Sequence, residues 1–170
     1  FKSLMRLVRL IRREKPPVIQ SWMYHADLAA LLAVCLSGRR SCTKLFWGIR
    51  CSDMDVGRYR YLRGVCSLLS KCPDGIIANS HSGLKFHTDV LGYRPKRTAV
   101  IPNFFDTERY RFRASARSRI RKELGLNEND FVIAAVARVD AMKDYPNFLS
   151  ALEKVDGVTA LAIGKGTETL

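Results

Sequence analysis

The sequence lacks the features that mark membrane-spanning and secreted proteins. No apolar run approaches the roughly 20 residues needed to cross a bilayer, and the longest one, residues 28–36, is typical of a buried helix. The first residues, Phe1 to Lys15, are basic and amphipathic but contain no small-residue cleavage site of a signal peptide. Because the first residue is also not Met, we expect the chain to begin within a longer protein.

Cysteine occurs in no metal-binding pattern. The five cysteines form no C-x-x-C pair, and an odd number does not favour a disulfide framework. They are Cys35, Cys42, Cys51, Cys66 and Cys72. We therefore expect no metal site, and reduced thiols in a cytoplasmic protein.

The formal net charge is +13, and the positive charge is concentrated in two segments. Residues 1–15 carry six Lys or Arg and one Glu, and residues 94–123 carry ten Lys or Arg and three acids. Such segments favour an anionic partner, which could be nucleotide phosphate, an anionic membrane surface or nucleic acid. The alternative is a solvated face whose counter-charges lie elsewhere in a longer protein.

Strand and helix patterns alternate along the chain. Helical patterns over 27–36, 56–70 and 145–152, and one beginning after Ser80 or Ser82, separate short apolar runs. These runs are residues 18–22, 44–49, 75–78, 98–101, 131–137 and 158–163. The alternation predicts an α/β fold with parallel sheets and helices on their faces. A change in composition over residues 107–117 indicates a domain boundary there.

Polar residues or glycine follow each predicted strand. In open parallel sheets, ligands bind beyond the carboxyl ends of the strands, so the repetition of such residues predicts a ligand cleft. The residues are His25, Arg50, Asn79 with Ser80, Asn103, Arg138 and Gly164.

Several stretches resemble the family 4 retaining glycosyltransferases. FVIAAVARVDAMKDYPNFLSAL at 131–152 resembles the opening of the family's nucleotide-binding domain, and TAVIPNFFDTERYRF at 98–112 resembles its domain junction. SWMYHADLAALLA at 21–33, FWGIR at 46–50 and IIANSHSG at 76–83 resemble segments of its acceptor domain. The order and spacing of these pieces carry the resemblance from Pro17 onward.

The resemblance implies a GT-B type architecture with parts of two Rossmann-like domains. Residues 1–112 would be the C-terminal part of the acceptor-side domain, and residues 113–170 the start of the nucleotide-sugar domain. The family's glycine-rich N-terminal loop and its Glu-containing C-terminal segment are absent, so we expect the isolated chain to be inactive.

On the donor side, Arg138 and Lys143 match the family's basic pair that grips the donor diphosphate. Two cations placed there would stabilise the charge that builds on the leaving group. Gly164 matches the first glycine of a G-x-G turn, where backbone amides can approach a nucleotide. Ala137 departs from the family, which usually has glycine at that position.

On the acceptor side, the resemblance implies that His25, Arg50 and Asn103 line the sugar and acceptor site. His25 matches the histidine that lies near the transferred sugar, where an imidazole could orient a hydroxyl. We interpret His81 and His87 as structural.

Asp53 and Asp55 form a D-x-D pattern, which holds a divalent metal in another glycosyltransferase class. Because the surrounding resemblance is to the metal-independent class, we interpret these two residues as a loop and a helix start. No cofactor is expected apart from the nucleotide-diphosphate sugar, which is a substrate. No carboxylate pair suggests double displacement. The resemblance to the family implies a front-face retaining reaction assisted by the leaving phosphate.

We therefore expect sugar transfer to a hydroxyl on a glycan or lipid-linked acceptor. The pathway would make polysaccharide, lipopolysaccharide or glycolipid in the cytoplasm, or peripherally at the inner face of the membrane. The alternative function is a basic module that binds anionic membrane or nucleic acid, although no nucleic-acid motif is readable in the sequence.

Overall fold

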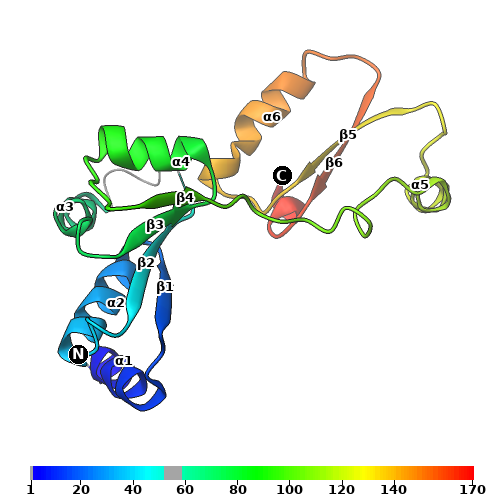
Figure 1. The fold of residues 1–170 in the computed structure, drawn as a ribbon. Coiled ribbons are helices and arrows are strands. Elements are labelled where there is room, and N and C mark those ends of the chain that lie inside the picture. Colours follow the sequence, from blue (N-terminus) through cyan, green and yellow to red (C-terminus); the bar gives the residue numbers. More distant parts are fainter. Residues whose placement is uncertain (1, 52–58) are drawn as a thin grey trace. The chain divides into compact units, whose positions relative to one another are not determined.

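The computed structural model describes residues 2–51 and 59–170 of the chain (Figure 1). The chain separates into two compact units, one ending at Phe105 and the other beginning at Asp106. Each unit contains a parallel sheet with helices packed against it. The expected α/β fold with two parallel sheets is therefore confirmed.

The first unit is built on a four-stranded parallel sheet. Its strands are β1 (Val18–Trp22), β2 (Lys44–Ile49), β3 (Gly75–Ala78) and β4 (Thr98–Val100), and they follow one another in that order across the sheet. The register pairs Trp22 with Gly48 and Ala78 with Val100. All four carboxyl ends therefore meet at one edge, as the strand pattern predicted.

Helices α2 (Tyr24–Leu36) and α3 (Arg60–Leu69) cover one face of this sheet. Alternate strand residues point into that layer because successive side chains on a strand face opposite ways. The buried residues of this core include Leu45, Trp47, Ile49, Ile76 and Ala78 from the strands and Ala30, Leu31 and Cys66 from the helices. The opposite face carries Gln20, Trp22, Gly48 and Ile77, which line a pocket described below.

Helix α1 (Lys2–Glu14) packs its apolar stripe on α2. Val8 and Ile11 are buried against Ala33 and Val34. Arg12 donates hydrogen bonds to the carbonyl oxygen of Leu36 at 2.8 Å and to that of Ser37 at 3.4 Å. These carbonyls lie at the C-terminal end of α2, where helix carbonyls lack intrahelical partners and a cation is favourable.

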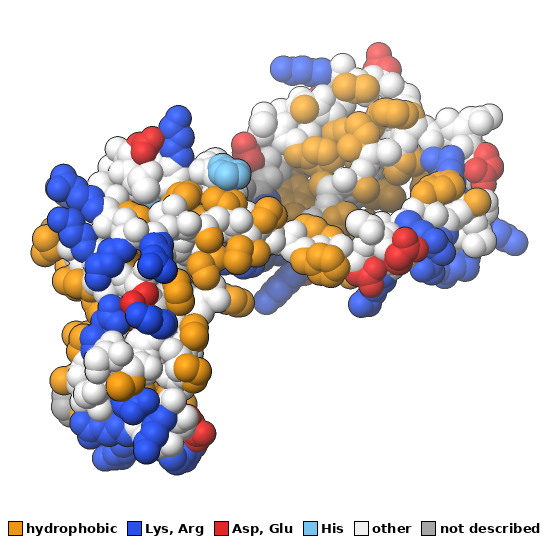
Figure 2. All heavy atoms as spheres, viewed as in Figure 1, with side chains coloured by type: hydrophobic (Ala, Val, Ile, Leu, Met, Phe, Trp, Pro, Cys, Tyr) orange, Lys and Arg blue, Asp and Glu red, His pale blue; other side chains and the backbone are white. Residues whose placement is uncertain are grey.

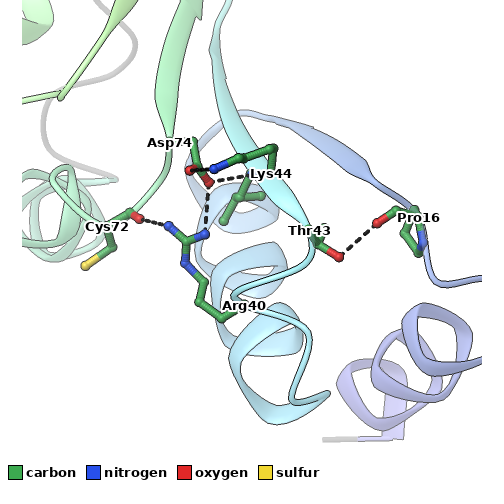
Figure 3. A network of polar contacts seen from close by, with 7 residues as sticks. Pro16, Arg40, Thr43, Lys44, Cys72 and Asp74 are labelled. Carbon is green, nitrogen blue, oxygen red and sulfur yellow. Dashed lines mark hydrogen bonds and ion pairs between the residues drawn. The ribbon is translucent and has the colours of Figure 1, made fainter.

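A carboxylate fastens the amino ends of β2 and β3 together (Figure 3). Asp74 accepts hydrogen bonds from the backbone N–H of Leu45 at 3.0 Å, from Arg40 at 2.9 Å and from Lys44 at 3.2 Å. Burial alone would raise the pKa of Asp74, but the backbone bond and the two cations outweigh it and lower the pKa to about 2. This network is structural and lies at the sheet edge opposite the carboxyl ends.

The second unit has a two-stranded parallel sheet of β5 (Phe131–Val136) and β6 (Val158–Ile163). Helix α5 (Ala114–Glu123) precedes it, and α6 (Tyr145–Leu152) connects the strands. Short 3-10 turns occupy Ala141–Lys143 and Thr167–Thr169. Hydrophobic side chains are open to solvent on this unit (Figure 2), where Val136 is 75% exposed and Phe131 is 64% exposed.

Several cations of the basic segment 94–123 are engaged within the second unit. Arg117 and Arg121 donate to carbonyl oxygens in the turn before β5, including those of Glu128 at 3.0 Å and Asp130 at 2.9 Å. Arg119 pairs with Glu123 one turn along α5, at 3.0 Å. Part of the positive charge there therefore orders the turn that leads into β5.

Within the described ranges, none of the helices is both long enough and apolar enough to cross a membrane.

Helix α4 (His81–Lys85) follows its N-cap Ser80, whose side chain accepts a hydrogen bond from the N–H of Gly83, and continues as a π-helical turn over Phe86–Val90. The D-x-D residues Asp53 and Asp55 lie outside the described residues.

Candidate functional site

The carboxyl edge of the first sheet carries a pocket of about 500 Å³. It is lined by residues at the ends of β1, β2 and β3 and by the segment that follows β4. The lining residues are Gln20, Trp22, Gly48, Ile49, Arg50, Ile77, Ala78, Asn79, Ile101, Pro102, Asn103, Phe104 and Phe105. Two residues predicted for the acceptor side, Arg50 and Asn103, therefore share one pocket, whereas His25 does not line it.

A strained residue makes the turn from β1 into α2. Met23 has φ 75° and ψ 155°, a backbone conformation that is essentially restricted to glycine. Its N–H donates to the carbonyl oxygen of Gly48 on β2 at 3.1 Å, which ties the turn to the neighbouring strand. Because the chain turns so sharply, α2 begins at Tyr24, and His25 lies in the first helical turn rather than in a loop.

His25 is exposed in the first turn of α2, and its ring packs edge-to-face on Tyr59 with 5.7 Å between ring centroids. The residue before it, Tyr24, is buried and anchored from behind. The Tyr24 hydroxyl donates to Nε2 of His87 at 3.0 Å, and Nδ1–H of His87 donates to the carbonyl oxygen of Gly83 at 2.8 Å. Burial lowers the pKa of His87, which favours the neutral ring, and the residue lies in the core.

Asp27 lies in the first turn of α2 with its side chain buried in the protein. It is 3% exposed and accepts a hydrogen bond from Ser21 Oγ at 2.6 Å, together with a backbone hydrogen bond from Gly48. Burial raises the pKa of Asp27 to about 7, although both hydrogen bonds oppose that shift. Ser21, Met23 and Asp27 thus hold the β1–α2 turn against β2.

Trp22 forms one wall of the pocket. The Arg50 guanidinium lies over its ring, 5.1 Å from the centroid, while the ring edge passes over Gly48. A Cβ built on Gly48 would lie 2.4 Å from Trp22 Cδ1 and 2.6 Å from the Ser21 carbonyl oxygen. Only glycine permits this approach, so Gly48 sets where the indole lies.

Asn79, the residue after β3, supplies a polar group to the pocket. Its Nδ2 donates to the Arg50 carbonyl oxygen at 3.4 Å, while its Oδ1 is buried without a hydrogen-bond partner among the described residues. The strand-end pattern pointed to Asn79, but nothing in the sequence separated it from the other polar residues there. Trp22 was missed as a site residue because a tryptophan at a strand end reads equally well as core.

In the second unit, the loop after β5 presents Arg138. Its Nε and Nη2 donate to Asp140 Oδ2 at 3.2 Å and 3.1 Å. Asp140 also accepts the backbone N–H of Met142 at 3.0 Å and so begins the short turn that ends at Lys143. This backbone bond, followed by Arg138 and the charge of Lys143, lowers the pKa of Asp140. The two predicted donor-side cations therefore flank one ionised carboxylate.

The loop after β6 lies directly against the loop that carries Arg138. Backbone hydrogen bonds of 2.9 Å join Ala137 to Ile163 and Val139 to Lys165. Gly164 has φ 151°, and a Cβ there would lie 2.1 Å from the Ala137 carbonyl oxygen and 3.0 Å from the Arg138 nitrogen. The structure thus brings Arg138 and Gly164 together.

This arrangement is chemically suited to an anion. Asp140 engages two of the five guanidinium N–H donors of Arg138, which leaves the others available to phosphate oxygens. The backbone of Gly164 lies beside the backbone nitrogen of Arg138, and glycine leaves the main chain there open to close approach by a ligand. Among the residues that the structure describes, no group of three His, Cys, Asp or Glu side chains could hold a metal ion.

The two units and their strand-end sites define an α/β protein of the GT-B type with parts of two Rossmann-like domains. A sequence model of Glycosyltransferase Family 4 matches residues 1–109, and the chain therefore belongs to this family. Among curated proteins, none matches the sequence significantly.

Solved structures show the same fold. The crystal structure of Anabaena HepE (Alr3699) with UDP-glucose matches with a TM-score of 0.81 at 22% identity, over 98% of this chain and 45% of the HepE chain. HepE with UDP matches with a TM-score of 0.81 at 22% identity, over 95% of this chain and 43% of that one. The present chain thus spans less than half the length of HepE.

Proposed function

We propose that this chain is part of a retaining glycosyltransferase that moves a sugar from a nucleotide-diphosphate sugar to a hydroxyl acceptor. The observation that carries the proposal is the contact between the β5 and β6 loops, where Gly164 backs onto the loop bearing Arg138. The family membership of the chain and the resemblance of residues 131–152 to the family's nucleotide-binding segment support it.

In this proposal Arg138 and Lys143 hold the donor diphosphate. The acceptor oxygen bonds to the anomeric carbon on the face that the diphosphate leaves, and the acceptor proton passes to the departing phosphate oxygen. Negative charge grows on the diphosphate as the glycosidic bond breaks, so the two cations stabilise the transition state more than the ground state. Retention follows because bond formation and departure occur on one face.

The burial of Asp27, the carboxylate closest to His25 in the sequence, supports a mechanism without a protein nucleophile. Asp27 is buried and hydrogen-bonded to Ser21, so it is not presented to a substrate at the rim. His25 is exposed and orients an acceptor hydroxyl or a sugar hydroxyl in this proposal. The acceptor in this proposal is a glycan or a lipid-linked acceptor, and the product enters polysaccharide, lipopolysaccharide or glycolipid.

The test is the affinity of the chain for UDP, with GDP and ADP as comparators, by isothermal titration. The crystallisation of HepE with UDP makes uridine diphosphate the first probe to use. Arg138→Ala removes charged hydrogen bonds to phosphate and should weaken binding by roughly 10- to 100-fold. The matched control is Arg119→Ala, which removes an exposed arginine paired with Glu123 in the same unit. Equal affinities for the wild type and Arg138→Ala would reject the diphosphate role.

Helix α1 supports a second proposed property, peripheral docking on an anionic membrane. Its apolar stripe is already packed on α2, and Arg12 is hydrogen-bonded to the end of that helix. Lys2, Arg6 and Arg9 remain exposed on the outer side of α1. Lys and Arg side chains gather over this end of the first unit in Figure 2. Each such cation contributes about 1 kcal/mol near an anionic surface.

Flotation with vesicles tests this docking. Arg6→Gln with Arg9→Gln should weaken binding to phosphatidylglycerol vesicles by roughly 25- to 30-fold, from about 1 kcal/mol per charge. The same number of charges removed from α5, as Arg119→Gln with Lys122→Gln, is the control. Equal loss in both variants would reject docking through α1, and binding to DNA but not to vesicles would favour the nucleic-acid alternative.

A further inference from the structure

Helix α3 carries apolar side chains on two opposite sides. Its inner side packs against the core of the first unit through Cys66 and Leu69. Its outer side presents Tyr61, Val65 and Leu68, which are 85%, 45% and 80% exposed. A helix on the surface of a globular protein normally has polar residues on its outer side, and a helix that is apolar on both sides is normally covered on both. The outer side of α3 therefore has the composition of a contact surface.

The three outer residues, Tyr61, Val65 and Leu68, form an outer stripe along the helix. They are separated by four and three positions, which places them on one side over two turns. Single exposed apolar residues are ordinary on protein surfaces, whereas a contiguous group of them marks an interaction surface. The same spacing is the one by which amphipathic helices contact their partners. The geometry of the outer stripe therefore fits a second helix.

Gly64 leaves open space beside the outer stripe. It lies between Tyr61 and Val65 in the sequence, and among the described residues no atom would come within 4 Å of a Cβ built there. Glycine is less favourable than alanine inside a helix, so helix formation does not account for it. The missing side chain allows another backbone to approach closely. A helix that packs on the outer stripe has room to do so at this position.

Cations flank the outer stripe at both ends of α3, which itself contains no Asp or Glu. Arg60 is the first residue of the helix, and Lys71 follows its C-terminal end. Arg94 lies near that end too, because its backbone N–H donates to Ser70 Oγ at 2.8 Å. In the part of the chain that the structure describes, none of the three cationic groups has a hydrogen-bond or ion-pair partner. A cation in the first turn of a helix is unfavourable, so Arg60 does not serve to stabilise α3.

We propose that the outer stripe of α3 is a docking site for an amphipathic helix of a partner protein, whose acidic residues lie opposite Arg60 and Lys71. These two cations are roughly 16 Å apart along the helix axis, so acidic residues near both ends of a three-turn partner helix can reach them. A second copy of this chain is a poor partner, because paired α3 helices would bring like charges together. The inference goes beyond the proposed function and does not depend on it.

The probe is a synthetic helical peptide with leucine on one face and glutamate on the others. Two peptides of the same length serve as comparators, one with lysine in place of glutamate and one with serine in place of leucine. Amide chemical-shift mapping by NMR locates the contact on the chain. We expect saturable shifts at Tyr61, Gly64, Val65 and Leu68 with the glutamate–leucine peptide, and none of comparable size there with either comparator.

Two variants test the geometry of the docking site. Gly64→Gln fills the open space without changing the charge, and it should weaken peptide binding by roughly 10-fold or more, as expected for an overpacked contact. Because glutamine is a better helix former than glycine, this variant should melt at the wild-type temperature or above it, which separates lost docking from lost folding. Tyr61→Gln with Leu68→Gln should weaken binding at least as much. The matched control is Phe112→Gln, which removes a 78% exposed aromatic from the second unit and should leave binding unchanged.

Reversal of the flanking charge tests the chemistry of the partner. Arg60→Glu with Lys71→Glu should make the chain prefer the lysine peptide to the glutamate peptide, and added salt should weaken both contacts. The inference is overturned if the glutamate–leucine peptide shifts only α1 and α5, or if Gly64→Gln binds it as tightly as the wild type. Shifts on α3 with phosphatidylglycerol vesicles but not with the peptide would also overturn it, and would make the outer stripe a membrane-contact surface. The affinity for UDP, measured separately, reports on the donor site alone.

Discussion

Replacing Gly48 by alanine tests how β1 and β2 position the pocket. The added Cβ would lie 2.4 Å from Trp22 Cδ1 and 2.6 Å from the Ser21 carbonyl oxygen. Trp22 is exposed and can swing away, but the Ser21 oxygen belongs to the backbone of the paired strand. The strand pair must therefore separate locally, which strains the 3.1 Å hydrogen bond from Met23 to Gly48.

We expect Gly48→Ala to lower the free energy of unfolding by about 1–3 kcal/mol, the usual cost of overpacking. For a unit of this size that lowers the melting temperature by roughly 5–20 °C. Both tryptophans lie in the first unit, so tryptophan fluorescence follows its unfolding separately from the second unit.

Gly64→Ala is the matched control. Gly64 lies within α3, and among the described residues no atom would come within 4 Å of its new Cβ. Alanine is about 0.5–1 kcal/mol better than glycine in a helix, so this variant should melt at a higher temperature. In the background of Trp22→Ala, Gly48→Ala should cost less, because one of the two clashes is gone. The reasoning is refuted if Gly48→Ala melts with the wild type, or if the two substitutions are strictly additive.

Three other substitutions test the remaining parts of the structure. Asp74→Asn should cost about 2 kcal/mol at neutral pH and abolish the loss of stability that the wild type shows between about pH 4 and pH 2, because the folded state holds this pKa near 2; acid titration of the tryptophan signal measures both. Asp27 has the opposite sign: its pKa of about 7 means that the unfolded chain ionises first as pH rises from about 4 to about 7. The free energy of unfolding of the wild type should fall by roughly 2–4 kcal/mol over that pH range, and Asp27→Asn should flatten this pH dependence. The same pH dependence in the variant and the wild type would contradict the raised pKa of Asp27. Gly164→Ala should disrupt the β5 and β6 loops and abolish UDP binding. Gly157→Ala, at φ 69° and with no described atom within 4 Å of the new Cβ, should cost about 1 kcal/mol and bind UDP normally.

Most of the fold could be predicted from the sequence because the strands are short apolar runs with clear stops. The bounds of β1, β2, β3 and β6 agree with the predicted runs, and α6 begins and ends at the predicted residues. Pro146 in its first turn marks the start of α6, and the glycines that follow α5 and β6 mark the ends of those two elements. These signals are local, so one sequence is enough to find them.

The site depends on contacts that no local pattern contains. Helix α2 begins three residues earlier than its pattern suggested, because Met23 adopts a glycine-like conformation that the bond to Gly48 holds. The hydrogen bonds that Arg117 and Arg121 donate to the turn before β5 join residues that are 11 and 9 positions apart, and the sequence pattern did not predict them. From the sequence, the cations of the basic segment 94–123 were expected to face solvent or an anionic partner, whereas Arg117 and Arg121 donate hydrogen bonds within the second unit.

The donor site is the central claim, and amide chemical-shift mapping by NMR during a UDP titration tests it most directly. We predict saturable shifts at Arg138, Val139, Gly164, Lys165 and Gly166, the residues where the β5 and β6 loops meet, and none of comparable size on α1 or α5. Shifts confined to the cations of α1 and α5, with the two loops unchanged, would contradict a nucleotide site at the ends of β5 and β6.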